Sequence, residues 1–170
     1  MEAPNAPAYH PTIMKNRDNQ AVGKPAITPV QTQKPPKRIL VVDDDQDIRQ
    51  FTVDILTDSG YEVDGAKDGA DGWDALQASN YDLVITDNQM PRMTGMEMIG
   101  KLRAAYMTLP VILATRHVPK YELSCQPWLE PDVMLERPFS NTDLLGAVKK
   151  IFGPDAGGDE VKVSLLPKYI

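Results

Sequence analysis

The sequence has a single cysteine, two histidines and no long apolar run. With Cys125 alone, the chain can form neither an internal disulfide nor a multi-cysteine zinc site, a composition typical of reducing compartments. A membrane-spanning helix needs about 20 mainly apolar residues, and no window of the sequence comes close. The first twenty residues carry prolines and charges in place of an apolar segment, so the sequence predicts no secretory signal.

Charge and proline are unevenly distributed along the 170 residues, which predicts one domain flanked by two tails. Residues 1–36 are rich in proline and poor in apolar side chains, so we expect a disordered arm. Residues 37–153 form the expected domain, whose acidic charge disfavours direct binding to nucleic acid. Residues 154–170 form a tail whose last ten residues alternate apolar and polar side chains. This pattern is typical of a docking segment and equally of a frayed end.

Within the domain, short β-branched runs alternate with helical patterns. The runs predict five strands, at residues 38–42, 61–63, 81–86, 110–114 and 132–135. Apolar residues at helical spacing predict helices that end near residues 59, 79, 105 and 152. The second begins at Asp71, and Thr94 and Ser140 cap the third and fourth. Prolines leave room for only a short helix between the last two strands. This alternation predicts an α/β domain with a parallel sheet and right-handed crossovers.

Polar side chains follow four of the predicted strands. Asp43 and Asp44 end the first strand, Asp87 the third and Thr115 the fourth, and Arg137 follows the fifth. Because the carboxyl ends of parallel strands share one edge, we expect these side chains to converge there. Three carboxylates repel one another without a cation, and oxygen ligands suit Mg²⁺. A hydroxyl and a guanidinium are donors that a phosphoryl group requires, so the pattern predicts phosphoryl chemistry beside a metal.

In these residues the sequence resembles the receiver domain of bacterial two-component response regulators, over about residues 37–152. The matching segments are ILVVDDD at 39–45, Asp87 with MPRMTG at 90–95, LPV at 109–111 through Thr115, and RPF at 137–139. The resemblance implies a doubly wound, five-stranded parallel sheet of order 2-1-3-4-5, the flavodoxin-like (CheY-like) fold.

The resemblance also implies that a histidine kinase or histidine phosphotransfer protein phosphorylates Asp87. Asp44 and Asp87 would hold Mg²⁺ directly, with the backbone carbonyl of Gln89, and Asp43 would act through water. Thr115 would bond the phosphoryl group and report it to an output protein. No output module follows residue 152, so we expect a stand-alone receiver in the bacterial cytoplasm. It would be no enzyme beyond its own phosphorylation and dephosphorylation.

Two positions near the expected site depart from the family pattern. Arg137 stands before Pro138 where the family has lysine, and its guanidinium is planar and larger than an ammonium. Arg116 follows Thr115 where a small residue is usual, and its cation can shield the phosphoryl site, bind the phosphoryl group or obstruct other donors.

Two other functions stay open at this point. The same fold can serve as a phosphate-independent interaction module, a pseudo-receiver. A strand followed by Asp-x-Asp is also typical of aspartate-nucleophile phosphatases, although the chain lacks room for their cap domain.

Overall fold

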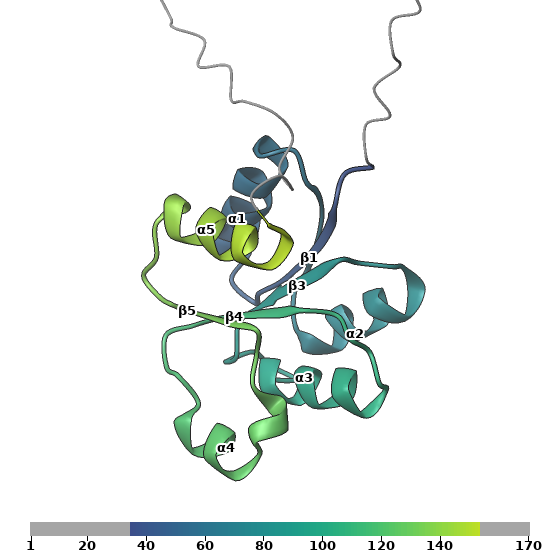
Figure 1. The fold of residues 1–170 in the computed structure, drawn as a ribbon, viewed down its shortest axis with the longest axis vertical. Coiled ribbons are helices and arrows are strands. Elements are labelled where there is room, and N and C mark those ends of the chain that lie inside the picture. Colours follow the sequence, from purple (N-terminus) through teal and green to yellow (C-terminus); the bar gives the residue numbers. More distant parts are fainter. Residues whose placement is uncertain (1–34, 154–170) are drawn as a thin grey trace, which may run out of the picture. The chain divides into compact units, whose positions relative to one another are not determined.

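The structure, a computed structural model, describes residues 35–153, which form a five-stranded parallel sheet between two layers of helices (Figure 1). The strand order is β2-β1-β3-β4-β5, so the expected doubly wound fold is confirmed. The strands are β1 (Arg38–Val42), β2 (Glu62–Ala66), β3 (Leu83–Thr86), β4 (Val111–Thr115) and β5 (Val133–Glu136). The predicted tail at 154–170 and all but the last two residues of the predicted arm at 1–36 lie outside the described residues.

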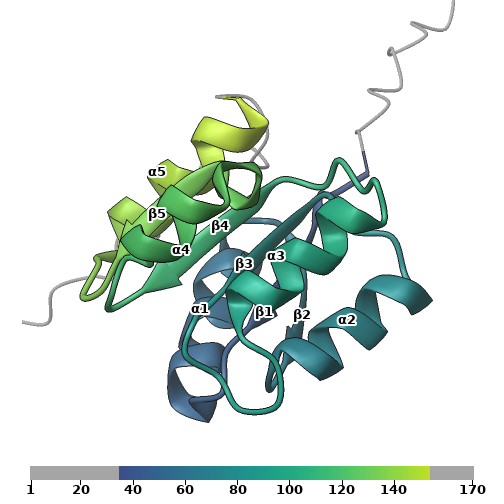
Figure 2. The same cartoon turned by 90° about the horizontal axis from the view of Figure 1, so that it is seen from below.

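Helices cover both faces of the sheet. They are α1 (Gln46–Asp58), α2 (Gly69–Ala78), α3 (Gly95–Ala104), α4 (Lys120–Cys125), the 3₁₀ turn η1 (Pro127–Leu129) and α5 (Asn141–Phe152). Helices α1 and α5 lie on one face, and α2, α3 and α4 lie on the other (Figures 1 and 2). None of the helices in residues 35–153 has the length and apolar character that crossing a bilayer requires.

Strand β1 is buried on both faces, which explains why residues 39–42 are all apolar. Ile39 and Val41 pack into the core layer shared with α1 and α5, whereas Leu40 and Val42 pack into the layer shared with α2 and α3. All four side chains are almost completely buried, and each contributes about 1.5–3 kcal/mol through burial. A strand covered on both sides has apolar residues on both faces instead of alternating polar and apolar ones. Packing on both sides also holds the end of the strand in place.

Strand β3 begins at Leu83, two residues after the predicted start, and two more predicted boundaries were wrong at the β2 edge of the sheet. Strand β2 continues beyond residue 63 through Asp64 and Gly65, because backbone pairing with β1 overrides the low strand propensity of these residues. Helix α2 begins two residues before the predicted start at residue 71, because the Asp68 carboxylate accepts hydrogen bonds from the amides of Ala70 and Asp71.

Candidate functional site

The register of β1 against β3 places Asp43 beside Asp87. Val42 lies opposite Thr86, and the Asp87 amide donates to the Val42 carbonyl at 3.0 Å, extending the ladder beyond the strands. Each aspartate follows its strand directly, so both side chains emerge at the carboxyl edge of the sheet. Asp43 and Asp87 are 2% and 9% exposed, and Asp44 is exposed beside them. One carboxylate oxygen from each of the three aspartates lies within 4.8 Å of the others.

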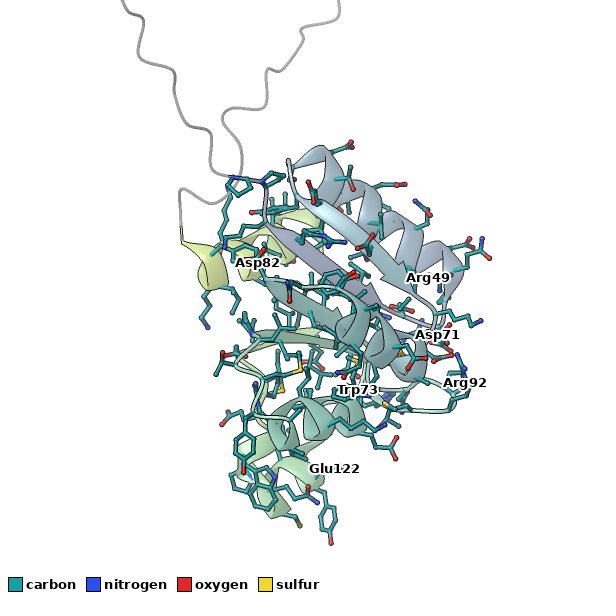
Figure 3. All side chains as sticks on the ribbon, turned by 90° about the vertical axis from the view of Figure 1, so that its right-hand side faces the viewer. Arg49, Asp71, Trp73, Asp82, Arg92 and Glu122 are labelled. Atoms are coloured by element: carbon teal, nitrogen blue, oxygen red, sulfur yellow. The ribbon has the colours of Figure 1, made fainter. Side chains whose placement is uncertain are left out.

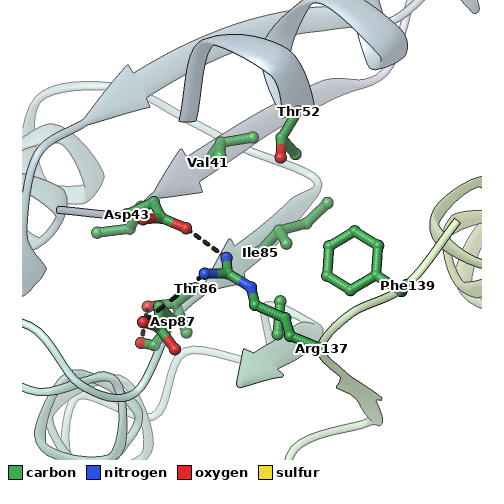
Figure 4. A pocket seen from close by; sticks show the side chains of 10 residues that line it. Val41, Asp43, Thr52, Ile85, Thr86, Asp87, Arg137 and Phe139 are labelled. Carbon is green, nitrogen blue, oxygen red and sulfur yellow. Dashed lines mark hydrogen bonds and ion pairs between the residues drawn. The ribbon is translucent and has the colours of Figure 1, made fainter. Parts of the chain in front are cut away.

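The Arg137 guanidinium lies between the two buried carboxylates, as Figure 4 shows. Its Nη2 forms an ion pair and hydrogen bond with Oδ2 of Asp43, and its Nη1 lies 3.8 Å from Oδ2 of Asp87. The amide of Arg137 donates to the Thr115 carbonyl at 2.9 Å, which fixes the start of the side chain next to β4. The arginine is 11% exposed and borders a cavity of about 10 Å³ lined in part by Thr52 and Phe139.

Burial dominates the electrostatics of Asp43. It raises the pKa of Asp43 above its ordinary value of 3.8, although the hydrogen bond and charge of Arg137 and the amide of Asp45 act in the opposite direction. Three carboxylates against one guanidinium leave two negative charges unbalanced at the edge. Closely spaced carboxylate oxygens are the donors that Mg²⁺ prefers, so the donor set fits this ion.

Sequence reasoning missed two residues that hold the aspartates in place. Arg49, on α1, donates from Nη1 to the backbone carbonyl of Asp43 at 2.6 Å. The amide of Asn88 donates to Oδ1 of Asp87 at 2.7 Å, which leaves Oδ2 facing Arg137. The Asn88 contact is a local turn after a strand-ending aspartate and was detectable from the sequence. The Arg49 contact was not, because six residues separate it from its partner.

The remaining predicted site residues lie around this centre with different exposure. Thr115 is buried at the end of β4, where its hydroxyl donates to the His117 carbonyl at 3.2 Å and accepts from the His117 amide at 3.3 Å. Gln89, Arg116 and Pro138 are all exposed, and the peptide bond between Arg137 and Pro138 is cis. Within residues 35–153, no hydrogen bond to the Gln89 carbonyl is found.

A doubly wound parallel sheet with an acidic cluster at its carboxyl edge defines a class of α/β domains that bind ligands at that edge. Residues 39–149 match the model of one family of this class, the response regulator receiver domain. The chain therefore belongs to the receiver domain family.

Individual relatives agree with this assignment. Over 134 residues, the chain is 32% identical to the response regulator MprA of Mycobacterium sp. (strain KMS), covering 77% of this chain and 58% of that protein. The chain thus spans little more than half the length of this relative. The structure resembles Vibrio cholerae chemotaxis protein CheY4 (TM-score 0.63, 29% identity, covering 68% of this chain and 98% of that one). It also resembles the response regulator TrrA of Thermotoga maritima, solved in complex with Mg²⁺ and BeF (TM-score 0.61, 36% identity, covering 68% and 98%).

Proposed function

We propose that this chain is a phosphoacceptor that receives a phosphoryl group on Asp87 from a histidine kinase or histidine phosphotransfer protein. The observation that carries the proposal is the convergence of Asp43, Asp44 and Asp87 at one edge, with Arg137 between the two buried carboxylates. Membership in the receiver family supports the same conclusion.

The geometry suggests which oxygen reacts. Oδ1 of Asp87 accepts the Asn88 amide, so Oδ2 is the free nucleophile and faces the Arg137 guanidinium. A bond from Oδ2 to phosphorus forms as the phosphorus–nitrogen bond of the donor phosphohistidine breaks. The leaving imidazole, already protonated on its other ring nitrogen, takes the electron pair and departs neutral. Arg137 then lies where negative charge develops on the phosphoryl oxygens.

Three groups of this chain would hold Mg²⁺: the carboxylates of Asp44 and Asp87 and the carbonyl of Gln89, with Asp43 acting through water. The bound ion would neutralise charge on the phosphoryl oxygens. TrrA, which was solved with Mg²⁺ and BeF, supports this part of the proposal. We expect Asp44→Asn to weaken Mg²⁺ binding and slow phosphorylation, both measured on the full chain. Unchanged phosphorylation in excess chelator would contradict the metal site.

The proposal also covers how phosphorylation of Asp87 would be signalled to a partner protein. To bond a phosphoryl group, the Thr115 hydroxyl must exchange its bonds to His117, which frees the connection from β4 to α4. That change would be read by a partner protein, and the chain would act as a stand-alone receiver in the bacterial cytoplasm. It would catalyse at most its own phosphorylation and dephosphorylation.

Intact-mass measurement after incubation with Mg²⁺ and acetyl phosphate tests the phosphoacceptor role. We expect an adduct of about 80 Da, the mass of one phosphoryl group, on the wild-type chain and none on Asp87→Asn. An adduct that persists in Asp87→Asn would move the acceptor elsewhere. Multiple turnover of unrelated phosphoesters would instead indicate a phosphatase.

A pseudo-receiver is the second candidate, and two contacts favour it. Arg137 already forms an ion pair with Asp43, and the Thr115 hydroxyl is already bonded to His117. The Thr115 hydroxyl is thus satisfied without phosphate, and Arg137 is satisfied in part, because its buried Nε has no hydrogen-bond partner. Absence of any adduct on a folded wild-type chain in Mg²⁺ would support this second function.

A further inference from the structure

The loop at residues 88–94 joins Asp87 to α3, and its two ends are tied together by Asn88. The Asn88 carbonyl accepts the Gly95 amide at 3.2 Å, and its Oδ1 accepts the Met96 amide at 3.1 Å. A Cβ at Gly95 would lie 2.2 Å from the carbonyl oxygen of Asp87, so only glycine permits this approach. These contacts fix where the loop leaves and returns, but they do not hold its middle.

Arg92 holds the middle of the loop to α2 (Figure 3). Its Nε donates to Oδ2 of Asp68 at 2.7 Å, and its Nη2 bonds the same oxygen and Oδ1 of Asp71, the latter at 2.5 Å. The other oxygen of Asp68 caps α2, so one buried carboxylate serves both the helix and the loop. Arg92 has a φ of +64°, a left-handed conformation that a non-glycine residue keeps only when its surroundings impose it.

The loop backbone touches α2 as well. A Cβ at Gly69 would lie 2.5 Å from the carbonyl oxygen of Met93, so the first turn of α2 and the loop are packed without space between them. The ion pairs of Arg92 therefore act on a loop that already abuts the helix.

We propose that Arg92 is a positioning residue for the metal site, holding the loop that carries Gln89, whose carbonyl would join Asp44 and Asp87 in holding Mg²⁺. The inference rests on the proposed function, because Gln89 matters only if Mg²⁺ binds there. Gln89 lies two residues after Asp87 and three before Arg92. Within residues 35–153, no hydrogen bond to its carbonyl is found. Groups that orient metal ligands commonly change metal affinity by an order of magnitude when removed.

The direction in which Mg²⁺ affinity changes when Arg92 is removed distinguishes a positioning role from a simple effect of its charge. Removing a cation near an acidic cluster should strengthen binding of a divalent cation, because less positive charge repels it. Loss of positioning should weaken binding instead. We expect Arg92→Ala to raise the Mg²⁺ dissociation constant roughly tenfold, measured by calorimetry on the full chain without phosphodonor. Arg92→Gly, which relieves the left-handed backbone, should do the same, and Arg92→Lys should restore part of the affinity.

Lys67→Ala is the matched control. Lys67 pairs with Asp71 at 3.3 Å but makes no ion pair or hydrogen bond with the loop, so this variant should keep wild-type affinity. In metal-free buffer, backbone amides of residues 89–94 should exchange hydrogen faster in Arg92→Ala than in Lys67→Ala.

Three results would overturn the inference. Arg92→Ala that binds Mg²⁺ as tightly as the wild type removes the positioning role and leaves the proposed function intact. Equal weakening in Lys67→Ala would show that the loss of affinity does not come from the contacts of Arg92 that hold the loop, because Lys67 pairs only with Asp71. If the folded wild-type chain binds no Mg²⁺, both the proposed metal site and the role of Arg92 are wrong. This outcome is recognisable because the wild type and all variants then behave alike.

Discussion

At the scale of single residues, the most informative position is Arg137. A planar guanidinium reaches two carboxylates at once, and the structure places it between Asp43 and Asp87. Both aspartates are nearly buried, so the arginine is their principal counter-charge in the described part of the chain. Buried charges that lose their partner destabilise a protein far more than exposed ones do.

We therefore expect Arg137→Ala to lower the free energy of unfolding by about 3–5 kcal/mol in metal-free buffer, because two carboxylates stay buried without a cation. Urea denaturation measures this loss, and Mg²⁺ should recover more stability in the variant than in the wild type. Arg137→Lys should lose less, since the charge remains. An alanine variant as stable as the wild type would show that Arg137 does not neutralise the pocket.

Arg116, unlike Arg137, is exposed, and it follows Thr115 directly in the chain. Removing a charge-assisted contact typically costs about 1.5–3 kcal/mol, enough to slow phosphorylation measurably. We expect the rate of Asp87 phosphorylation by acetyl phosphate, followed by intact mass, to fall in Arg137→Ala and to stay near the wild-type value in Arg116→Ala. The reverse order would assign the family lysine's role to Arg116.

At the scale of elements, the helices differ in how they begin. Side chains of Asp45, Asp68, Thr94 and Ser140 cap α1, α2, α3 and α5, whereas Pro119 precedes α4 without a side-chain cap. Helix α4 also buries none of its residues. The prolines that shorten this helix were visible in the sequence, and so were the caps of α3 and α5. The Asp68 cap was missed, because the predicted helix began at Asp71.

The carboxylate at the start of α2 gives a pH prediction. Burial raises the pKa of Asp68, but the Asp71 amide, the Arg92 guanidinium and the Ala70 amide outweigh it and hold the pKa below the ordinary 3.8. A lowered pKa means that the unfolded chain binds the proton more readily. Asp68 thus stabilises the fold above about pH 4, and this contribution is lost as pH falls through its lowered pKa.

Asp68→Asn tests this, because asparagine can still cap the helix but cannot titrate. We expect the variant to be less stable than the wild type at pH 7, with the difference shrinking as pH falls from 5 towards 2. Urea midpoints across this range measure it. A difference that stays constant with pH would mean that the charge of Asp68 contributes nothing.

At the scale of the whole molecule, residues 38–152 carry eleven Lys or Arg and nineteen Asp or Glu, a net charge of −8. The order of the strands was predictable from the resemblance to receiver domains. The meeting of Asp43 with Asp87 was predictable because the carboxyl ends of parallel strands share one edge. The pairing of Arg137 with Asp43, 94 residues away, was not, since it depends on how one long side chain is placed. The same is true of Arg92 and Asp68, whose contact joins two loops after different strands.

Acidic surface and an acidic site together predict how the domain responds to metal. A ligand present at 100 times its dissociation constant stabilises the folded state by about 2.7 kcal/mol. We expect Mg²⁺ at that level to raise the urea midpoint of the wild type accordingly. NaCl of matched ionic strength, which only screens charge, should raise it less. Equal effects of the two salts would mean that no specific site is filled.

The strand order also has a consequence for how the chain folds during synthesis. Of the five strands described, β1 is the first to leave the ribosome, yet it lies between β2 and β3 and contributes side chains to both core layers. Strand β1 has no β3 to pair with until Thr86 has emerged, nearly fifty residues later. Parallel pairing over such separations is slow and leaves apolar strands exposed to other chains. The segment that ends in the site is thus the one most in need of protection, by a chaperone or by rapid growth of the chain, while the protein is being made.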